Sequence, residues 1–175
     1  PDALFPIGGY PGDEDKAREM FPKLDQAKTR EDFVEAAKWL KGRADSTGKV
    51  AAVGFCYGGG MVNFLATRLG TDLSAGVAFY GSSPDLAEVP KIKAPLMGHW
   101  ALQDVPFPIA GVDALEGRLQ AAKVAYEFHR YDAQHAFFNE TQVGAKKLLP
   151  VVEYEPGAAK LAWQRTLGFF EHHLR

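Results

Sequence analysis

Short apolar segments alternate with amphipathic segments along this chain, and this pattern predicts strands that alternate with helices. Four segments have the length and the alanine, valine and aromatic content of buried strands: 49–53, 75–81, 94–100 and 124–131. Five others carry apolar residues at helical spacing: 13–21, 30–40, 61–69, 113–122 and the segment that starts at Pro156. Such alternation is typical of an α/β fold with a mainly parallel sheet and flanking helices.

Local signals set the expected limits of the first helices. Residues 1–12 are rich in proline and glycine and predict a loop, and Pro22 should end the first helix. Thr29, with Asp32 three residues later, is similar to a capping box and predicts that the second helix starts there. We expect one face of that helix to be buried: Phe33, Ala36, Ala37 and Leu40.

One glycine-rich turn organises the rest of the chain. Residues 54–60 read Gly-Phe-Cys-Tyr-Gly-Gly-Gly and join the strand at 49–53 to the helix at 61–69. A strand, a sharp turn and a helix are the setting of a nucleophile elbow, usually written Gly-x-Ser-x-Gly. Cys56, the only cysteine, takes the central position. We expect positions 54 and 58 to require glycine because larger side chains there would strike the helix that follows.

Two other interpretations of this turn are weaker or less specific. A phosphate-binding loop would end in Gly-Lys-Ser/Thr, and a dinucleotide-binding turn would read Gly-x-Gly-x-x-Gly. The turn here ends Gly-Gly-Met, and Cys56 stands where the second glycine of the dinucleotide pattern would be. A buried structural cysteine beside packing glycines stays open as the alternative.

Composition narrows the class of protein. The 175 residues suit one domain, 1–175, and the mixed charges, with a formal net charge of −2, give no sign of nucleic-acid or membrane binding. A single cysteine excludes an intrachain disulfide and a cysteine-based zinc cluster, and we expect no cofactor. A reducing, cytoplasmic location is expected. The chain begins with Pro1 and not with Met, so we expect further residues before it. A signal peptide among those residues, and with it an exported form, therefore stays open. A homo-oligomer also stays open.

Three residue types needed for acyl transfer follow the ends of predicted strands. In open α/β sheets, ligands bind outside the carboxyl ends of the strands. Cys56, Asp104 and His135 each come after such an end, in the chain order nucleophile, acid, histidine. His135 would take the thiol proton, and Asp104 would orient the imidazole. The backbone N–H of Tyr57 would donate to the oxyanion, whereas we find no second donor in this chain.

The other histidines and acids fit structural roles better. His99 and His129 fall within predicted strands, and His172 and His173 end the last helix, where positive charge is favourable. Among the acids, Asp132 suits a turn, and Asp85 and Asp113 do not follow a strand end. No spacing of histidines and carboxylates indicates a metal site.

With these residues in place, the chain resembles the dienelactone hydrolase (carboxymethylenebutenolidase) family of α/β-hydrolases. The resemblance rests on the motif at 54–59, on Asp104 and on His135-Ala136-Phe137, and it covers nearly the whole chain. It implies an α/β-hydrolase fold and cleavage of a small ester or lactone through a cysteinyl acyl intermediate.

Two departures from this family change the expectations. The family's full domain has further strands and a helix before this region, with the second oxyanion donor and a glutamate that helps to control the thiol, so we expect the domain here to be N-terminally incomplete. Dienelactone-cleaving members hold the substrate carboxylate with two arginines, but the corresponding stretches here are 6–8 and 138–140, without arginine. We therefore expect weak activity toward dienelactone and a preference for neutral lactones or aryl esters.

Aromatic residues near the three candidate residues could form an apolar pocket for such substrates, with ordinary core packing as the alternative: Trp100, Phe107, Phe137 and Phe138. A different class of function also stays open. Cys56 could be a redox-responsive thiol on a non-catalytic α/β-hydrolase scaffold. Ester hydrolysis before and after alkylation of the thiol separates the two functions.

Overall fold

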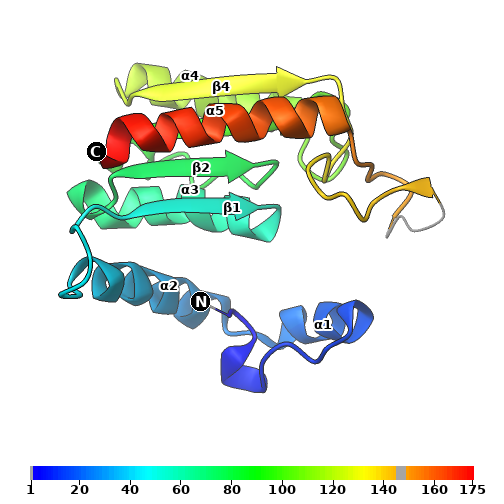
Figure 1. The fold of residues 1–175 in the computed structure, drawn as a ribbon, viewed down its shortest axis with the longest axis horizontal. Helices are drawn as coiled ribbons and strands as arrows, with labels where there is room; N and C mark the ends of the chain where they lie inside the picture. The colour runs from blue at the N-terminus through cyan, green and yellow to red at the C-terminus, as the bar shows by residue number, and fades with distance from the viewer. Residues whose placement is uncertain (1, 145–148) are drawn as a thin grey trace.

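A computed structural model describes residues 2–144 and 149–175; Pro1, with which the expected N-terminal loop begins, lies outside them. The helices and strands follow one another along the chain (Figure 1) as α1 (Glu14–Met20), α2 (Gln26–Lys41), β1 (Ala51–Phe55), α3 (Tyr57–Leu69), β2 (Ala75–Phe79), β3 (Leu96–Ala101), α4 (Ile109–Ala121), β4 (Tyr126–Tyr131) and α5 (Pro156–Leu174). Short 3₁₀ helices lie at Phe5–Ile7, Phe21–Lys23, Gly70–Asp72 and Val89–Lys91.

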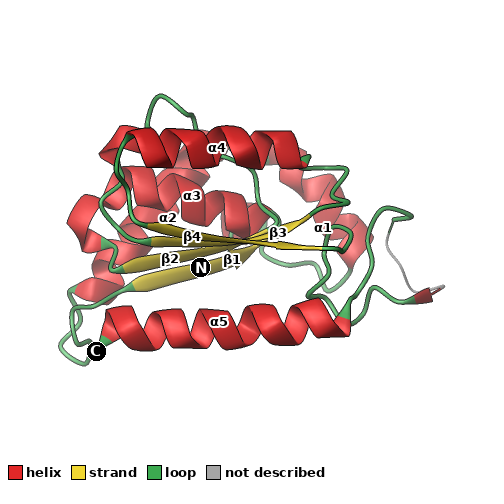
Figure 2. Cartoon of the chain, turned by 90° about the horizontal axis from the view of Figure 1, so that it is seen from above, coloured by secondary structure: helices red, strands yellow, loops and turns green. Residues whose placement is uncertain are grey.

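The four strands form one parallel sheet in the order β1-β2-β3-β4. Helix α5 covers one face of this sheet, and α2, α3 and α4 lie on the other (Figure 2). The expected parallel α/β architecture is confirmed. Because all strands run the same way, the loops that follow β1, β3 and β4 meet at one end of the sheet.

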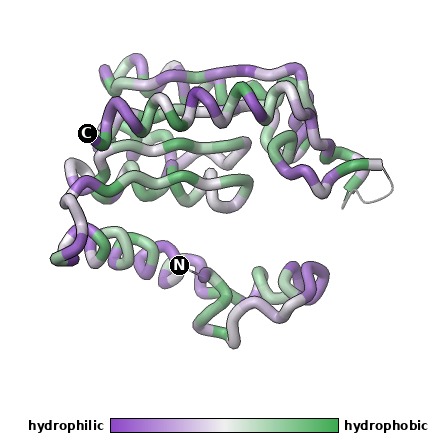
Figure 3. The backbone as a smooth tube through the Cα atoms, viewed as in Figure 1, coloured by the Kyte–Doolittle hydropathy of each residue, from purple (hydrophilic) through white to green (hydrophobic). Residues whose placement is uncertain are grey.

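Each face of the sheet has its own apolar core. On one side Met61, Val62, Leu65 and Leu69 of α3 pack with Leu115 and Leu119 of α4, and on the other Phe79 of β2 packs with Ala162 and Phe169 of α5. Figure 3 shows β1 and β2 as largely hydrophobic, in green, whereas β4 is largely hydrophilic, in purple. Burial of both faces explains why β2 is apolar throughout, and β3 is apolar apart from His99, where an alternating pattern would mark a strand with one exposed face.

The start of α2 differs from the expectation. The helix begins at Gln26, and the side chain of Asp25 accepts a hydrogen bond from Lys28 N at 3.0 Å, so Asp25 is the N-cap. Thr29 lies inside the helix and is buried, and Asp32 forms an ion pair with Lys28 at 2.6 Å. The predicted capping box at Thr29 and Asp32 is therefore wrong.

The face of α2 that was expected to be buried is covered only in part. Phe33, Ala36 and Ala37 are half-buried, but Leu40 is 46% exposed, and a cavity of about 330 Å³ separates this face from β1. Among the residues that the structure describes, β1 pairs with β2 and with no other strand, and its Val53 is 42% exposed. The edge of the sheet beside β1 is thus apolar and open.

Candidate active site

Cys56 occupies a sharp turn between β1 and α3. Its φ of 53° and ψ of −112° lie outside the regions that L-residues favour, and α3 begins at the next residue, Tyr57. Cys56 N donates to the carbonyl oxygen of Phe79 at 3.0 Å, and Gly60 N donates to the carbonyl oxygen of Cys56 at 3.1 Å. These bonds hold the strained residue so that its side chain stands exposed at the end of the sheet.

The glycines around Cys56 differ in what they permit. A Cβ on Gly54 would lie 2.0 Å from the carbonyl oxygen of Gly58, so the strand and the helix meet without room for a side chain. A Cβ on Gly58 would meet nothing within 4 Å, and the expectation that its side chain would strike the helix is wrong. Gly59 has the steric role instead, since its Cβ would lie 2.6 Å from the carbonyl oxygen of Phe79.

His135 lies between Cys56 and Asp104. Its Nε2 is 3.3 Å from Sγ of Cys56, and its Nδ1 is 2.8 Å from Oδ2 of Asp104. The side chains of His135 and Asp104 are 6% and 2% exposed, and the second carboxylate oxygen of Asp104 accepts from Phe107 N at 2.8 Å. The structure therefore brings together the three residues that the strand-end argument selected.

The pKa of His135 reflects opposing influences. Burial lowers it, but the hydrogen bonds to Asp104 and Cys56 and the negative charges of both partners outweigh burial and raise the pKa from 6.5 to about 9. In the protonated form, Nδ1–H is directed at Asp104 and Nε2–H at Sγ of Cys56. The imidazole is thus placed to exchange a proton with the thiol and with a substrate group or water bound beside it.

His99 belongs to a separate, internal network. It is fully buried, with Nδ1 2.9 Å from the hydroxyl of Tyr131 and Nε2 3.0 Å from the hydroxyl of Thr166. Burial, together with the charges of His129 and Arg165, lowers the pKa of His99 to about 3. It does not contact the site.

The remaining rival residues are also engaged away from Cys56. The ring of His129 stacks on His99, and His172 and His173 lie in the last turn of α5. Each rival acid has a local partner: Asp132 accepts from Gln103, Asp113 pairs with Arg130, and Asp85 accepts from Ala87 N.

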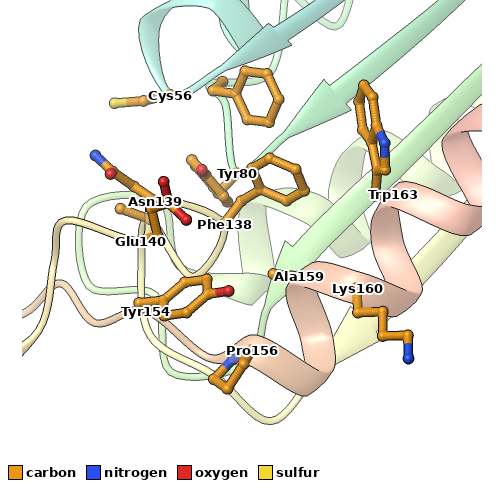
Figure 4. A pocket seen from close by; sticks show the side chains of 12 residues that line it. Cys56, Tyr80, Phe138, Asn139, Glu140, Tyr154, Pro156, Ala159, Lys160 and Trp163 are labelled. Carbon is orange, nitrogen blue, oxygen red and sulfur yellow. The ribbon is translucent and has the colours of Figure 1, made fainter.

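Two cavities adjoin Cys56. The larger, of about 660 Å³, is drawn in Figure 4 and is lined by Phe55, Cys56, Tyr80, Ala136, Phe138, Asn139, Glu140, Tyr154, Pro156, Ala159, Lys160 and Trp163. The smaller, of about 380 Å³, lies on the other side of Cys56 and includes Arg30, Ser82 and Phe107. The sulfur atom is therefore reachable from two directions.

Only two of the four aromatic residues expected in a pocket line either cavity. Phe138 lines the larger cavity and Phe107 the smaller one. Trp100 is buried in the core with its ring against Phe128, and Phe137 is fully buried beneath the site against Tyr80. Trp100 points into the α3–α4 core because residues of a strand alternate between the two faces of the sheet.

Sequence reasoning missed several residues of the larger cavity. Tyr80 follows the end of β2, and the strand-end argument could have found it; its ring meets His135 edge-on at 5.0 Å, and burial, followed by the charge of Cys56, raises its pKa. Tyr154 and Trp163 come from the segment before α5 and from α5 itself. No local signal in the sequence connects these two residues to Cys56.

The helix that follows Cys56 provides a donor for a developing negative charge. Tyr57 is the first residue of α3, so its N–H has no acceptor within the helix. The positive end of the helix dipole lies at the same place. In the described ranges 2–144 and 149–175, no group of three histidine, cysteine or acidic side chains could hold a metal ion. No helix in these ranges is long and apolar enough to cross a membrane.

Comparison with known proteins places the chain in a family. The dienelactone hydrolase family matches residues 3–174 of the chain. The chain belongs to this family. A protein from Saccharolobus solfataricus named "Putative carboxymethylenebutenolidase" is 33% identical over 150 residues, which are 83% of this chain and 54% of that protein. The carboxymethylenebutenolidase of Pseudomonas putida is 32% identical over 163 residues, which are 89% of this chain and 64% of that enzyme.

Solved structures agree on the fold. A dienelactone hydrolase-like promiscuous phosphotriesterase from metagenomic libraries superimposes with a TM-score of 0.74 at 20% identity, over 91% of this chain and 66% of that one. The α/β-hydrolase fold expected from the resemblance is confirmed. The chain spans somewhat more than half the length of the curated relatives that it matches.

Proposed function

We propose that this protein hydrolyses a small ester or lactone through a Cys56–His135–Asp104 triad and a cysteinyl acyl intermediate. The observation that carries the proposal is the position of His135, with one ring nitrogen 3.3 Å from Sγ of Cys56 and the other 2.8 Å from Asp104. Membership of the dienelactone hydrolase family supports hydrolysis of ester or lactone bonds as the reaction class.

In the first half-reaction, Sγ of Cys56 attacks the substrate carbonyl carbon while His135 holds the thiol proton. The carbonyl oxygen becomes negative near Tyr57 N–H and the positive end of α3, which stabilise it. When the tetrahedral intermediate collapses, the bond to the alcohol oxygen breaks, and Nε2 of His135 gives that oxygen the proton. A thioester on Cys56 and a free alcohol result; in a lactone the alcohol remains attached to the acyl group.

In the second half-reaction, water takes the place of the alcohol. His135 accepts a proton from the water, whose oxygen attacks the thioester carbon. Collapse of this second intermediate breaks the carbon–sulfur bond, and the carboxylic acid leaves. Asp104 keeps the imidazole oriented and stabilises its charged form in both halves.

The test uses a chromogenic acetate ester and two variants. Cys56→Ala should abolish turnover and keep the thermal melting curve of the wild-type protein, because the side chain is exposed and only a sulfur atom is removed. Asp104→Asn should lower kcat strongly, by roughly four orders of magnitude in the serine-protease precedent for this change. Turnover that persists in Cys56→Ala, or after complete alkylation of the thiol, would rule out the covalent mechanism.

The redox alternative makes the opposite forecast. If Cys56 is a sensor thiol without a catalytic role, it should react with peroxide. The protein should then hydrolyse esters no faster than buffer does, both before and after alkylation. Hydrolysis that disappears in step with alkylation of Cys56 therefore separates the two functions in one titration.

A further inference from the structure

The charged residues of the larger cavity are distributed unevenly about Cys56. Among the described residues that line this cavity, Glu140 is the one acidic residue and Lys160 the one basic residue. In Figure 4, Glu140 lies with Asn139 toward the Cys56 end, whereas Lys160 lies on α5 at the far end with its amine pointing away from Cys56. Of these two charged side chains, the one on the Cys56 side of the cavity is therefore the negative one.

Hydrogen bonds on both sides of Glu140 along the chain fix the position of its backbone. Oδ1 of Asn139 accepts hydrogen bonds from Thr141 N at 3.1 Å and from the Thr141 hydroxyl at 2.9 Å, which makes a tight turn with Glu140 at its tip. Beyond it, Tyr154 N donates to the carbonyl oxygen of Gln142 at 2.9 Å. Glu140 is thus carried by a segment with defined backbone contacts.

The same turn determines which group of the Asn139 side chain faces the cavity. Because its side-chain oxygen accepts both bonds from Thr141, its NH₂ group is the part left to face the cavity. An amide N–H binds an uncharged oxygen well, but it cannot neutralise a carboxylate as a guanidinium does. Among the residues that the structure describes, no ion pair involves Glu140, so its charge is not neutralised by a partner there.

We propose that Glu140 is a specificity-determining residue that selects substrates whose acyl group is uncharged near the scissile carbonyl. This proposal rests on the proposed function and names its substrate class. An anionic acyl substituent would be repelled by Glu140, and an uncharged one can accept an N–H of Asn139 and contact Phe138. Because Glu140 is exposed, the repulsion is moderate and weakens as salt is added.

The experiment compares two esters of the same shape. They are p-nitrophenyl butyrate and its analogue in which a carboxylate replaces the terminal methyl. The hydrolysis rate of each ester in the presence of Cys56→Ala is subtracted as the spontaneous rate. The measured quantity is the ratio of kcat/KM for the anionic ester to kcat/KM for the neutral one. Variants are Glu140→Gln and Glu140→Lys. The control is Glu19→Lys, which makes the same charge change on an exposed residue of α1 outside both cavities.

The wild-type protein should prefer the neutral ester. Glu140→Lys should raise the anionic-to-neutral ratio by about tenfold at low salt, Glu140→Gln by a smaller factor, and added salt should reduce both effects. Glu19→Lys should leave the ratio as in the wild type. Ratios that stay within about twofold of the wild type in both Glu140 variants would overturn the inference. If the wild type hydrolyses neither ester above the Cys56→Ala rate, the proposed function fails as well.

Discussion

A Cβ on Gly54 would lie 2.0 Å from the carbonyl oxygen of Gly58, which makes this pair the tightest backbone approach around the nucleophile. Gly54 belongs to β1 and Gly58 to the first turn of α3, so their separation sets how sharply the chain turns at Cys56. A turn this sharp is what lifts Sγ out of the sheet toward His135. Within this pair the steric demand falls on Gly54, because a Cβ on Gly58 would meet nothing within 4 Å.

Alanine at these two glycines should therefore have opposite effects. Gly54→Ala forces backbone against backbone and should lower the free energy of unfolding by about 1–3 kcal/mol, with loss of ester hydrolysis because Cys56 moves. Gly58→Ala should leave stability unchanged or raise it by up to about 1 kcal/mol, since alanine is the better helix former. Urea unfolding measures both. Equal losses in the two variants would contradict the steric account.

His135 should make stability depend on pH on the alkaline side. Its pKa is about 9 in the folded chain against 6.5 for the free side chain, so the folded state holds the proton more tightly. The stabilisation is complete below about pH 6.5 and is lost as the pH rises toward about 9. The free energy of unfolding of wild type minus that of His135→Gln should decline over this window. A difference that stays flat from pH 6 to about pH 9 would argue against the raised pKa.

His99 should make stability depend on pH on the acid side. The Thr166 hydroxyl donates to the carbonyl oxygen of Ala162, so it accepts from His99 Nε2–H, and Nδ1 of His99 accepts from Tyr131. A pKa lowered to about 3 means that the unfolded chain takes up a proton first as the pH falls below 6.5.

Stability should therefore decrease between about pH 6.5 and pH 3 through this residue. His99→Gln cannot take up that proton, so the variant, though less stable at neutral pH, should show a shallower acid slope in urea unfolding. An unchanged slope would mean that His99 is protonated in the folded protein as readily as in the unfolded one.

The open side of β1 leads to a prediction about the extent of the domain. Val53 and Phe55 are 42% and 36% exposed on a strand that, within the described ranges 2–144 and 149–175, pairs on one side only. An apolar edge of this kind invites aggregation. We propose that residues upstream of Pro1 in the natural protein supply strands that cover this edge.

Residues 1–175 expressed alone should accordingly aggregate or melt without cooperativity, and Val53→Lys should improve solubility by charging the edge. Light scattering and thermal melting monitor both proteins. A soluble monomer of residues 1–175 with a cooperative melt and full activity would show that no additional strand is needed.

The candidate site was largely predictable because it depends on topology. Once the strands were read as parallel, residues after their ends had to meet at one end of the sheet, and this placed Cys56, Asp104 and His135 near one another. Tyr80 obeys the same rule and was overlooked. The neighbours contributed by the α5 region, such as Trp163, depend on how that helix lies across the sheet, which no local pattern encodes.

Predictions based on local chemistry were less secure where two similar signals compete. Asp25 and Thr29 are both acceptable N-caps, and tertiary packing decided between them, because Thr29 is buried in the final structure. Trp100 lies near the carboxyl end of β3, the end of the sheet at which Cys56 stands, yet its side chain packs in the α3–α4 core. Deciding such cases requires knowledge of which face of the sheet a strand residue occupies.

The covalent intermediate is the central claim, and the intact mass of the protein tests it most directly. The protein is mixed with excess p-nitrophenyl acetate and quenched in acid within the burst of nitrophenol release, and a peptide map then locates any modification. The account predicts one added acetyl group, on Cys56, that is absent from Cys56→Ala. Rapid ester hydrolysis with no acetyl group on Cys56 at any quench time would contradict it.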